Sequence, residues 1–199
     1  MTTRDGIVRA ARVVFGARGY AATTLTMIAR EAGLSNTAVY YYFSSVEDIY
    51  GEVVADTVGL VEASLADVTT QRSLPAQLGA YVAAMHRLDF QDRSMMGFMI
   101  HEYLDAARGA RLGRGKGPLM SSTERFLGSL VRAAVERGEL AADTDVRAMI
   151  GLLSSIMWGV GLYAGFVDEE ETMARVGVHL GAVLSRGLPL SGRPTRLVG

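Results

Sequence analysis

The sequence predicts an all-α protein. Its 199 residues include only four prolines, and long proline-free runs lie between them. Within these runs the apolar residues recur at helical spacing, i, i+3, i+4 and i+7. Glycine and serine interrupt the pattern where short helices are expected to end and begin. The length is sufficient for one domain or for two small ones.

Three short helices are expected within the first 45 residues. The first carries an apolar stripe and ends at Gly19. The second begins at Thr24 or Leu25, with Thr24 as a possible helix cap, and runs through Ala32. Gly33 then makes a tight turn, and Ser35 can cap a third helix over about 36–43. The stripe of the first helix consists of Ile7, Ala10, Ala11, Val14 and Phe15.

The chain after residue 45 is expected to form longer helices. A fourth helix covers 46–68 and has Glu47 and Asp48 in its first turn, where the helix dipole favours negative charge. Residues 188–199 lack periodicity and are expected to form a flexible tail. The other expected helices cover 74–88, 93–107, 119–137, 145–166 and 170–186, with a basic, glycine-rich loop at 108–118.

Charge and composition exclude several classes of site. The net charge is −1, so any basic surface must be local, and residues 1–45 hold five arginines against two acidic residues. There is no cysteine, which excludes disulfides, thiolate metal sites and cysteine nucleophiles. No group of residues has the spacing of metal ligands, so we predict neither a metal nor a cofactor.

One stretch, 148–167, is apolar enough to be considered as a membrane span. Acidic residues follow it directly at 168–171, and it lacks flanking basic anchors. Charged residues such as Arg4 and Asp5 also exclude a signal peptide at the start of the sequence. We therefore expect a buried helix in a soluble, cytoplasmic protein without a membrane partner.

Three short amphipathic helices with a glycine turn between the second and third are the sequence form of a helix-turn-helix. The third helix of that motif lies in the major groove of DNA, where its exposed side chains meet bases and phosphates. Its expected outer face carries Asn36 and three successive tyrosines, 40–42, whereas Val39 and Phe43 should pack inward. The alternative is that Tyr40 is a half-buried packing residue.

Residues 7–50 resemble the N-terminal DNA-binding domain of the TetR family of repressors. The resemblance rests on Phe15, Gly-Tyr at 19–20, Thr-Thr at 23–24, Ile-Ala at 28–29, Ala-Gly-Leu-Ser at 32–35 and Val-Tyr-Tyr-Tyr-Phe at 39–43. It implies a double-stranded DNA operator as partner. The residues predicted to bind DNA are Thr24, Thr26, Arg30, Ser35, Asn36, Thr37, Ala38, Tyr40, Tyr41 and Tyr42.

The sequence departs from the family pattern in two ways. Val46 stands where the family usually has a lysine that contacts a phosphate, so affinity or its salt dependence should be lower. The recognition helix has no arginine or lysine, which removes bidentate reading of guanine from that helix. Arg30 on the second helix could contribute a phosphate contact. Arg9, Arg12 and Arg18 are expected to be solvated charges.

The resemblance also implies that residues 1–45 are the DNA-binding domain and that 46–187 form a larger helical domain that binds a ligand and dimerises. The larger domain is rich in methionine and aromatic residues, which suit an adaptable apolar cavity. Ordinary core packing is the alternative for each of them. The residues predicted to bind the ligand are Met85, His86, Met96, Met99, His101, Tyr103, Phe126, Met157 and Trp158.

The last two expected helices, 145–166 and 170–186, carry glycine and serine at i, i+4 spacing. Small residues let helices approach closely, so we predict that these helices form the dimer interface as a four-helix bundle from two chains. Packing within one chain is the alternative. The predicted interface residues are Ser155, Gly159, Leu162, Phe166, Val176, Leu180 and Leu184.

These observations predict a ligand-responsive DNA-binding transcriptional regulator rather than an enzyme. The preferred hypothesis is a repressor that a small, largely apolar molecule releases from its operator. Such a ligand would tilt the helix over 46–68 and change the distance of about 34 Å between two recognition helices. One alternative is a regulator that acts through a protein partner, and another is a helical enzyme. Activation instead of repression depends on where the operator lies relative to a promoter.

Overall fold

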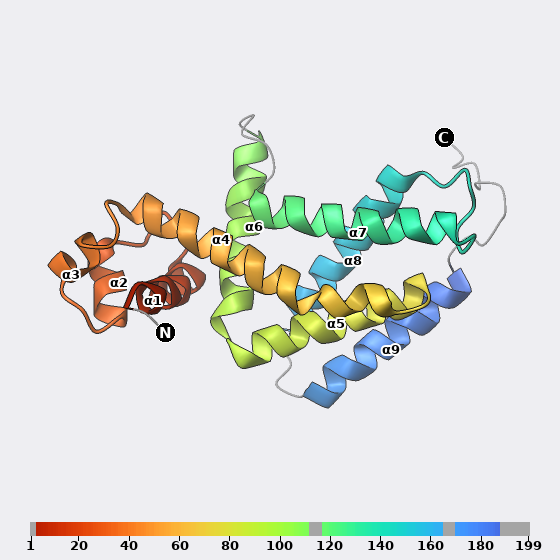
Figure 1. Cartoon of the computed structure of the whole chain (residues 1–199), viewed down its shortest axis with the longest axis horizontal. Coiled ribbons are helices and arrows are strands. Elements are labelled where there is room, and N and C mark those ends of the chain that lie inside the picture. The colour runs from red at the N-terminus through yellow and green to blue at the C-terminus, as the bar shows by residue number, and fades with distance from the viewer. Residues whose placement is uncertain (1–2, 112–116, 165–169, 188–199) are drawn as a thin grey trace. The chain divides into compact units, whose positions relative to one another are not determined.

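The computed structural model describes residues 3–111, 117–164 and 170–187. The expected tail, Phe166 and part of the basic loop lie outside these ranges. Within them every regular element is helical, which confirms the all-α class (Figure 1). The helices are α1 (Thr3–Arg18), α2 (Leu25–Glu31), α3 (Asn36–Tyr40), α4 (Val46–Ser64), α5 (Leu74–Gln91), α6 (Ser94–Arg111), α7 (Pro118–Glu136), α8 (Val146–Ala164) and α9 (Glu170–Gly187), with a 3-10 helix at Ala66–Thr70.

Three helix ends differ from the sequence prediction. The helix α3 stops at Tyr40 because the backbone N–H groups of Tyr42 and Phe43 both donate to Val39 O, which closes a turn. The helix α4 stops at Ser64, and the N–H of Val68 then donates to the oxygen of Leu65 in the tighter 3-10 pattern. The helix α6 continues to Arg111, four residues into the expected loop.

The chain divides into two compact units. Unit 1 comprises residues 1–64 and 87–122, and unit 2 comprises 65–86 and 123–199. This division differs from the expected domain boundary after residue 45, because α4 and α6 pack with α1. The N-terminal half of unit 1 groups α1, α2 and α3 beside the start of α4 (Figure 1).

The helices α1 and α6 cross in unit 1 with their backbones in contact. A Cβ atom on Gly16 would lie 2.9 Å from the backbone nitrogen of Phe98, and one on Gly97 would lie 3.0 Å from the oxygen of Gly16. A neighbouring aromatic cluster joins the same helices to α4. Within it, the ring of Tyr50 lies 5.1 Å from the ring of Phe15 and 5.8 Å from that of Phe98. The crossing and the cluster explain why α6 belongs to unit 1.

Unit 2 packs parts of α5 and α7 with α8 and α9. The rings of Tyr81 and Phe126 lie 6.2 Å apart, and burial raises the pKa of Tyr81 to about 12. The backbones of α5 and α9 approach closely, since a Cβ on Gly79 would lie 3.3 Å from the oxygen of Gly177. A Cβ at this distance would be tight, so Gly177 of α9 serves packing within the chain at this point.

The helix α8 corresponds to the stretch considered as a membrane span. By length and composition alone it could cross a membrane. One side is covered within unit 2, as the expected buried helix requires. The other side is exposed at Leu152, Leu162 and Tyr163, so the expectation is right for one side only.

Candidate nucleic-acid interface

The turn between α2 and α3 is set by Gly33. Its φ of +68° lies in the left-handed region, which glycine adopts without strain. The N–H of Gly33 donates to the oxygen of Arg30 at 3.1 Å, and the N–H of Leu34 donates to Ala29 O at 2.8 Å. These two bonds terminate α2 as a Schellman motif would, and they redirect the chain into α3.

Hydroxyl side chains cap both helices of the motif. Thr24 Oγ1 accepts the backbone N–H of Met27 at 3.3 Å, and Ser35 Oγ accepts that of Ala38 at 3.2 Å. Both residues are exposed, so each lies on the surface as well as fixing the start of a helix. The predicted roles of Thr24 and Ser35 as helix caps agree with these bonds.

The outer face of α3 and the turn after it carries the three tyrosines. Their exposed fractions are 59% for Tyr40, 84% for Tyr41 and 40% for Tyr42. Val39 and Phe43 are buried, as the helix-turn-helix interpretation expects. The rings of Tyr41 and Tyr42 meet edge to face with their centroids 5.1 Å apart. The tyrosine rings therefore face solvent rather than the core of unit 1.

The other predicted DNA-binding residues share this surface. Thr26, Arg30, Asn36 and Thr37 are exposed, whereas Ala38 is half-buried. One direct bond joins the two helices at the surface, since Asn36 Nδ2 donates to Thr26 Oγ1 at 2.9 Å. No sequence pattern indicated this bond, because the two residues lie on different helices.

A hollow of about 670 Å³ adjoins the tyrosines at the start of α4. Arg4 lies in its wall, paired with Glu52 at 2.8 Å and with its guanidinium 5.0 Å from the centre of the Phe43 ring. The hydroxyl and N–H of Ser44 donate to Asp48, and the hydroxyl bond chiefly holds the pKa of that carboxyl below its usual range. Val46 is half-buried and uncharged, so the position at which the family usually has a lysine presents no cation here.

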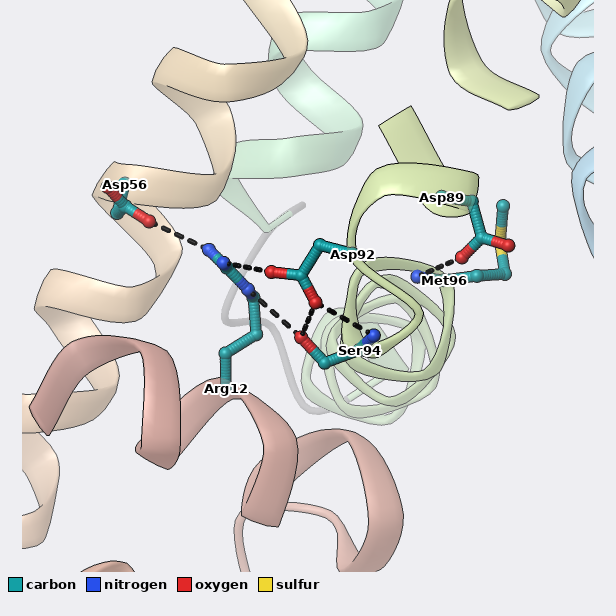
Figure 2. Close-up of polar contacts among 6 residues, drawn as sticks. All are labelled: Arg12, Asp56, Asp89, Asp92, Ser94 and Met96. Atoms are coloured by element: carbon teal, nitrogen blue, oxygen red, sulfur yellow. Dashed lines mark hydrogen bonds and ion pairs between the residues drawn. The ribbon is translucent and has the colours of Figure 1, made fainter. Parts of the chain in front are cut away.

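Arg12 is not the solvated charge that its sequence predicted. Its side chain is 4% exposed, and its guanidinium joins three elements of unit 1 (Figure 2). It donates to Asp56 on α4 at 2.7 Å, to Asp92 after α5 at 2.5 Å, and to the hydroxyl of Ser94 on α6 at 3.2 Å. The position of Arg12 on the buried stripe, four residues after Val8, was the signal for this role.

Two carboxylates, Asp92 beside Arg12 and Asp89 on α5, shape the start of α6. Asp92 accepts the N–H of Ser94 at 3.0 Å and its hydroxyl at 2.6 Å, and Asp89 accepts the N–H of Met96 at 3.2 Å (Figure 2). Burial raises the pKa of Asp92, but the bonds from Ser94 and Arg12 together lower it by more, so its net pKa is below the usual range. The ionised carboxylate is thus the form suited to this structure.

The sequence resembles known regulators over most of its length. The family profile described as bacterial regulatory proteins, tetR family, matches residues 7–53. The HTH-type transcriptional regulator SrpR of Pseudomonas putida is 29% identical over 184 residues, which cover 90% of this chain and 83% of SrpR. The uncharacterised HTH-type transcriptional regulator TtgW, also of Pseudomonas putida, is 30% identical over 126 residues, 63% of this chain and 89% of TtgW. This protein belongs to the TetR family. It is a DNA-binding transcriptional regulator.

Solved structures share the TetR-family fold across both units. FadR of Bacillus subtilis, in complex with stearoyl-CoA, gives a TM-score of 0.75 at 18% identity, covering 92% of this chain and 98% of FadR. The TetR-family regulator PfmR of Thermus thermophilus gives 0.67 at 23% identity, covering 98% and 100%. The ketosteroid regulator KstR2 of Mycobacterium tuberculosis gives 0.69 at 19% identity, covering 94% of each chain. At these identities the likeness concerns the fold.

The residues predicted to bind a ligand in this TetR-family chain divide between the two units. Met96, Met99, His101 and Tyr103 belong to unit 1, and the others belong to unit 2. The methionines and His86 are buried, whereas Tyr103, Phe126 and Trp158 are half-buried. The ring of His101 packs at the end of α1, since a Cβ on Gly19 would lie 3.1 Å from its Nδ1. His101 is thus placed close to the DNA-binding helices.

A buried carboxyl follows His101 on α6. Glu102 is 4% exposed, and burial raises its pKa to about 7 although the backbone N–H of Leu119 donates to it. Its Oε2 atom has no hydrogen-bond partner among the described residues. Glu102 was not among the predicted site residues, because nothing in its neighbours along the chain indicates burial of a charge.

The predicted dimer residues occupy both sides of α8 and α9. Ser155, Gly159 and Leu162 are exposed, Val176 and Leu180 are half-buried, and Phe166 lies outside the described residues. Leu184 is buried within unit 2. The large apolar side chains of Val178 and Val183 on α9 are exposed, and they were not among the predicted interface residues.

Proposed function

We propose that this protein binds a nearly palindromic operator as a homodimer and releases it when a small, largely apolar molecule binds. The observation that carries the proposal is the exposed face of α2 and α3, on which every predicted DNA-binding residue except Ala38 is exposed. Large apolar rings at a protein surface lose favourable burial unless a partner covers them. Duplex DNA is the partner that suits tyrosine hydroxyls and an asparagine amide.

The exposed side of α8 and α9 supports the homodimer. Leu152, Leu162 and Tyr163 on α8 and Val178 and Val183 on α9 are each at least half exposed. Two helices from each of two chains would bury these side chains in a four-helix bundle. A change of Leu162→Glu together with Val178→Glu should therefore give a monomer in analytical ultracentrifugation. A dimer that persists unchanged in the double variant would count against this interface.

The apolar effector is supported by the buried methionines of unit 2 and by two solved structures of similar fold. FadR of Bacillus subtilis was solved with stearoyl-CoA, and KstR2 of Mycobacterium tuberculosis is a ketosteroid regulator. Methionine side chains are flexible and polarisable, so they adapt to apolar ligands of different shapes. We therefore place the effector in unit 2, among the predicted ligand residues of that unit, chiefly Met85 and Met157, which are buried.

The helix α4 would transmit the effector's influence to the operator. Within unit 1 it is joined to α1 by the bond from Arg12 to Asp56, and to α1 and α6 by the contacts of Tyr50 with Phe15 and Phe98. A displacement of α4 would therefore move the DNA-binding helices with it. A coupling of about 1–3 kcal/mol would lower operator affinity between several-fold and a hundredfold.

Selection of bound duplexes from a random pool tests the DNA-binding part of the proposal. The recovered sites should have two-fold symmetry, with half-sites one helical turn apart. Stearoyl-CoA and a hydrophobic steroid are then titrated with and without the selected operator present. An effector that acts through coupling must bind less tightly to the operator complex, because coupling is reciprocal. Equal affinities under both conditions would refute release by that molecule.

The proposed role as a regulator also bears on where the protein acts and on whether it is an enzyme. A transcriptional regulator works where the chromosome is, so we place this protein in the cytoplasm. The relatives that it matches are regulators, and we propose no catalytic activity for it. Incubation of candidate effectors with the protein, followed by mass spectrometry, should return them unchanged.

A further inference from the structure

The exposed face of α3 carries no cation. Arg30 is the only arginine or lysine between residues 19 and 50, and it lies on α2. Guanine is most often read by a bidentate arginine or lysine, so that contact is absent from α3. Among the exposed side chains of α3, only Asn36 has a donor and an acceptor in one planar group. That group matches the N6 donor and N7 acceptor of adenine.

The amide of Asn36 is held in one orientation. Its Nδ2 donates to Thr26 Oγ1 at 2.9 Å, which turns the nitrogen end of the amide toward α2. The Oδ1 atom and the second N–H of Nδ2 remain outside this bond, as an acceptor and a donor side by side. Asn36 is also the first residue of α3, whose start is fixed by the Ser35 cap. Both ends of the side chain are thus positioned before DNA arrives.

The hydroxyl of Thr26 can also donate a hydrogen bond in this arrangement. Its oxygen accepts from Asn36, so its own O–H is available to donate to a phosphate oxygen. Phosphate contacts set the register of a protein on the duplex, whereas base contacts supply sequence preference. A single bond between Thr26 and Asn36 therefore couples the register of α2 to the base that α3 meets.

We propose that Asn36, oriented by Thr26, reads one adenine in the major groove of each operator half-site. The Oδ1 atom accepts the N6 amino hydrogen and the free Nδ2–H donates to N7. This assignment rests on the proposed binding of operator DNA and adds the base that the recognition helix selects. One such bidentate contact should favour A·T over the other base pairs at that position by about 5- to 150-fold.

The experiment compares full-length wild-type protein with three variants on duplexes selected from a random pool. Dissociation constants are then measured by fluorescence anisotropy for each of the four base pairs at every half-site position. Asn36→Asp should change the preference at one position from adenine to cytosine, because a carboxylate accepts from the N4 amino group of cytosine. Thr26→Val should reduce the adenine preference at the same position while the other positions keep theirs. Thr26→Ser keeps the hydroxyl and should retain the preference.

The outcomes separate this inference from the proposed function. Symmetric wild-type sites without an adenine at the position that Asn36→Asp alters would overturn the reading by Asn36 and leave operator binding intact. An equal loss of affinity for all four base pairs in Thr26→Val would reduce the bond to a structural bridge and overturn the positioning role. Failure of the wild-type protein to select any duplex would overturn both proposals. Circular dichroism checks that the variants fold, and both residues are exposed.

Discussion

Replacement of Arg12 by methionine should destabilise the protein far more than the same change at a surface arginine. The substitution keeps the length of the side chain but removes a buried guanidinium and its bonds to Asp56, Asp92 and Ser94. Removal of one partner of a buried ion pair typically costs about 3–5 kcal/mol of unfolding free energy. Here the side chains of Asp56 and Asp92 are 48% and 28% exposed, so water can partly replace the guanidinium. We therefore expect a loss of about 2–3 kcal/mol.

Thermal unfolding followed by circular dichroism measures this loss. For a chain of this length it corresponds to a decrease in Tm of about 5–10 °C. Arg12→Lys retains one charge but not the planar fork, so its loss should be intermediate. Arg18→Met is the matched control, because Arg18 is exposed in the last turn of the same helix, and it should lose less than about 1 kcal/mol. Equal decreases for Arg12→Met and Arg18→Met would refute the role assigned to the network.

Acid titration provides a second measurement of the same network. The pKa of Asp92 is lower in the folded protein than its ordinary value, so the unfolded chain binds more protons in the acid range. The stability that Asp92 contributes is therefore present above the ordinary pKa of about 4 and is lost as pH falls through the folded value. Arg12→Met removes part of the cause, and its stability should fall less on acidification. A parallel acid loss in both proteins would contradict this reasoning.

Three further sets of substitutions test separate features of the structure. Glu102→Gln should stabilise the protein by at least about 1 kcal/mol at pH 8 and by less at pH 5. The reason is the raised pKa of Glu102, because of which the stability of the wild-type protein falls as pH rises from the pKa of Glu102 in the unfolded chain to about 7. Identical gains at both pH values in urea titrations would exclude this. Gly16→Ala should lower the free energy of unfolding by about 1–3 kcal/mol, because the new Cβ would overlap the backbone of α6. Gly59→Ala on α4 should raise it by about 0.5–1 kcal/mol, because a Cβ there contacts nothing. Calorimetry that finds the same sign for both variants would be inconsistent with the crossing. Tyr41→Ala should alter the selected sequence and Tyr40→Phe should weaken all duplexes alike through a lost phosphate contact, and unchanged binding in both would show that the recognition face is wrongly assigned.

Local features of the fold could be predicted from the sequence because their causes are local. The caps at Thr24 and Ser35 and the left-handed turn at Gly33 each depend on residues within one helical turn. The three tyrosines lie between Val39 and Phe43, whose burial could be expected from their apolar character and their spacing of four residues. These features also shape the proposed DNA-binding surface, so the candidate DNA site was the part best specified by sequence pattern.

Features that depend on distant partners could not be predicted in this way. Arg12 stands on an apolar stripe, but its carboxylate partners lie 44 and 80 residues away. The methionines predicted to bind a ligand are buried, but their division between the two units could not be predicted, because it depends on contacts between helices far apart in the sequence. Likewise, the apolar composition of α8 indicated burial, but composition does not tell which side of a helix its own chain covers.

The crossing of Gly16 and Gly97 has a mechanical consequence. Where side chains separate two helices, a small shift of one can be absorbed by rotamer changes in the layer between them. At this point there is no such layer, because peptide groups touch directly. The N-terminal part of α6 therefore cannot shift against α1 without a backbone clash. We expect the two segments and the aromatic cluster beside them to move together as one rigid body.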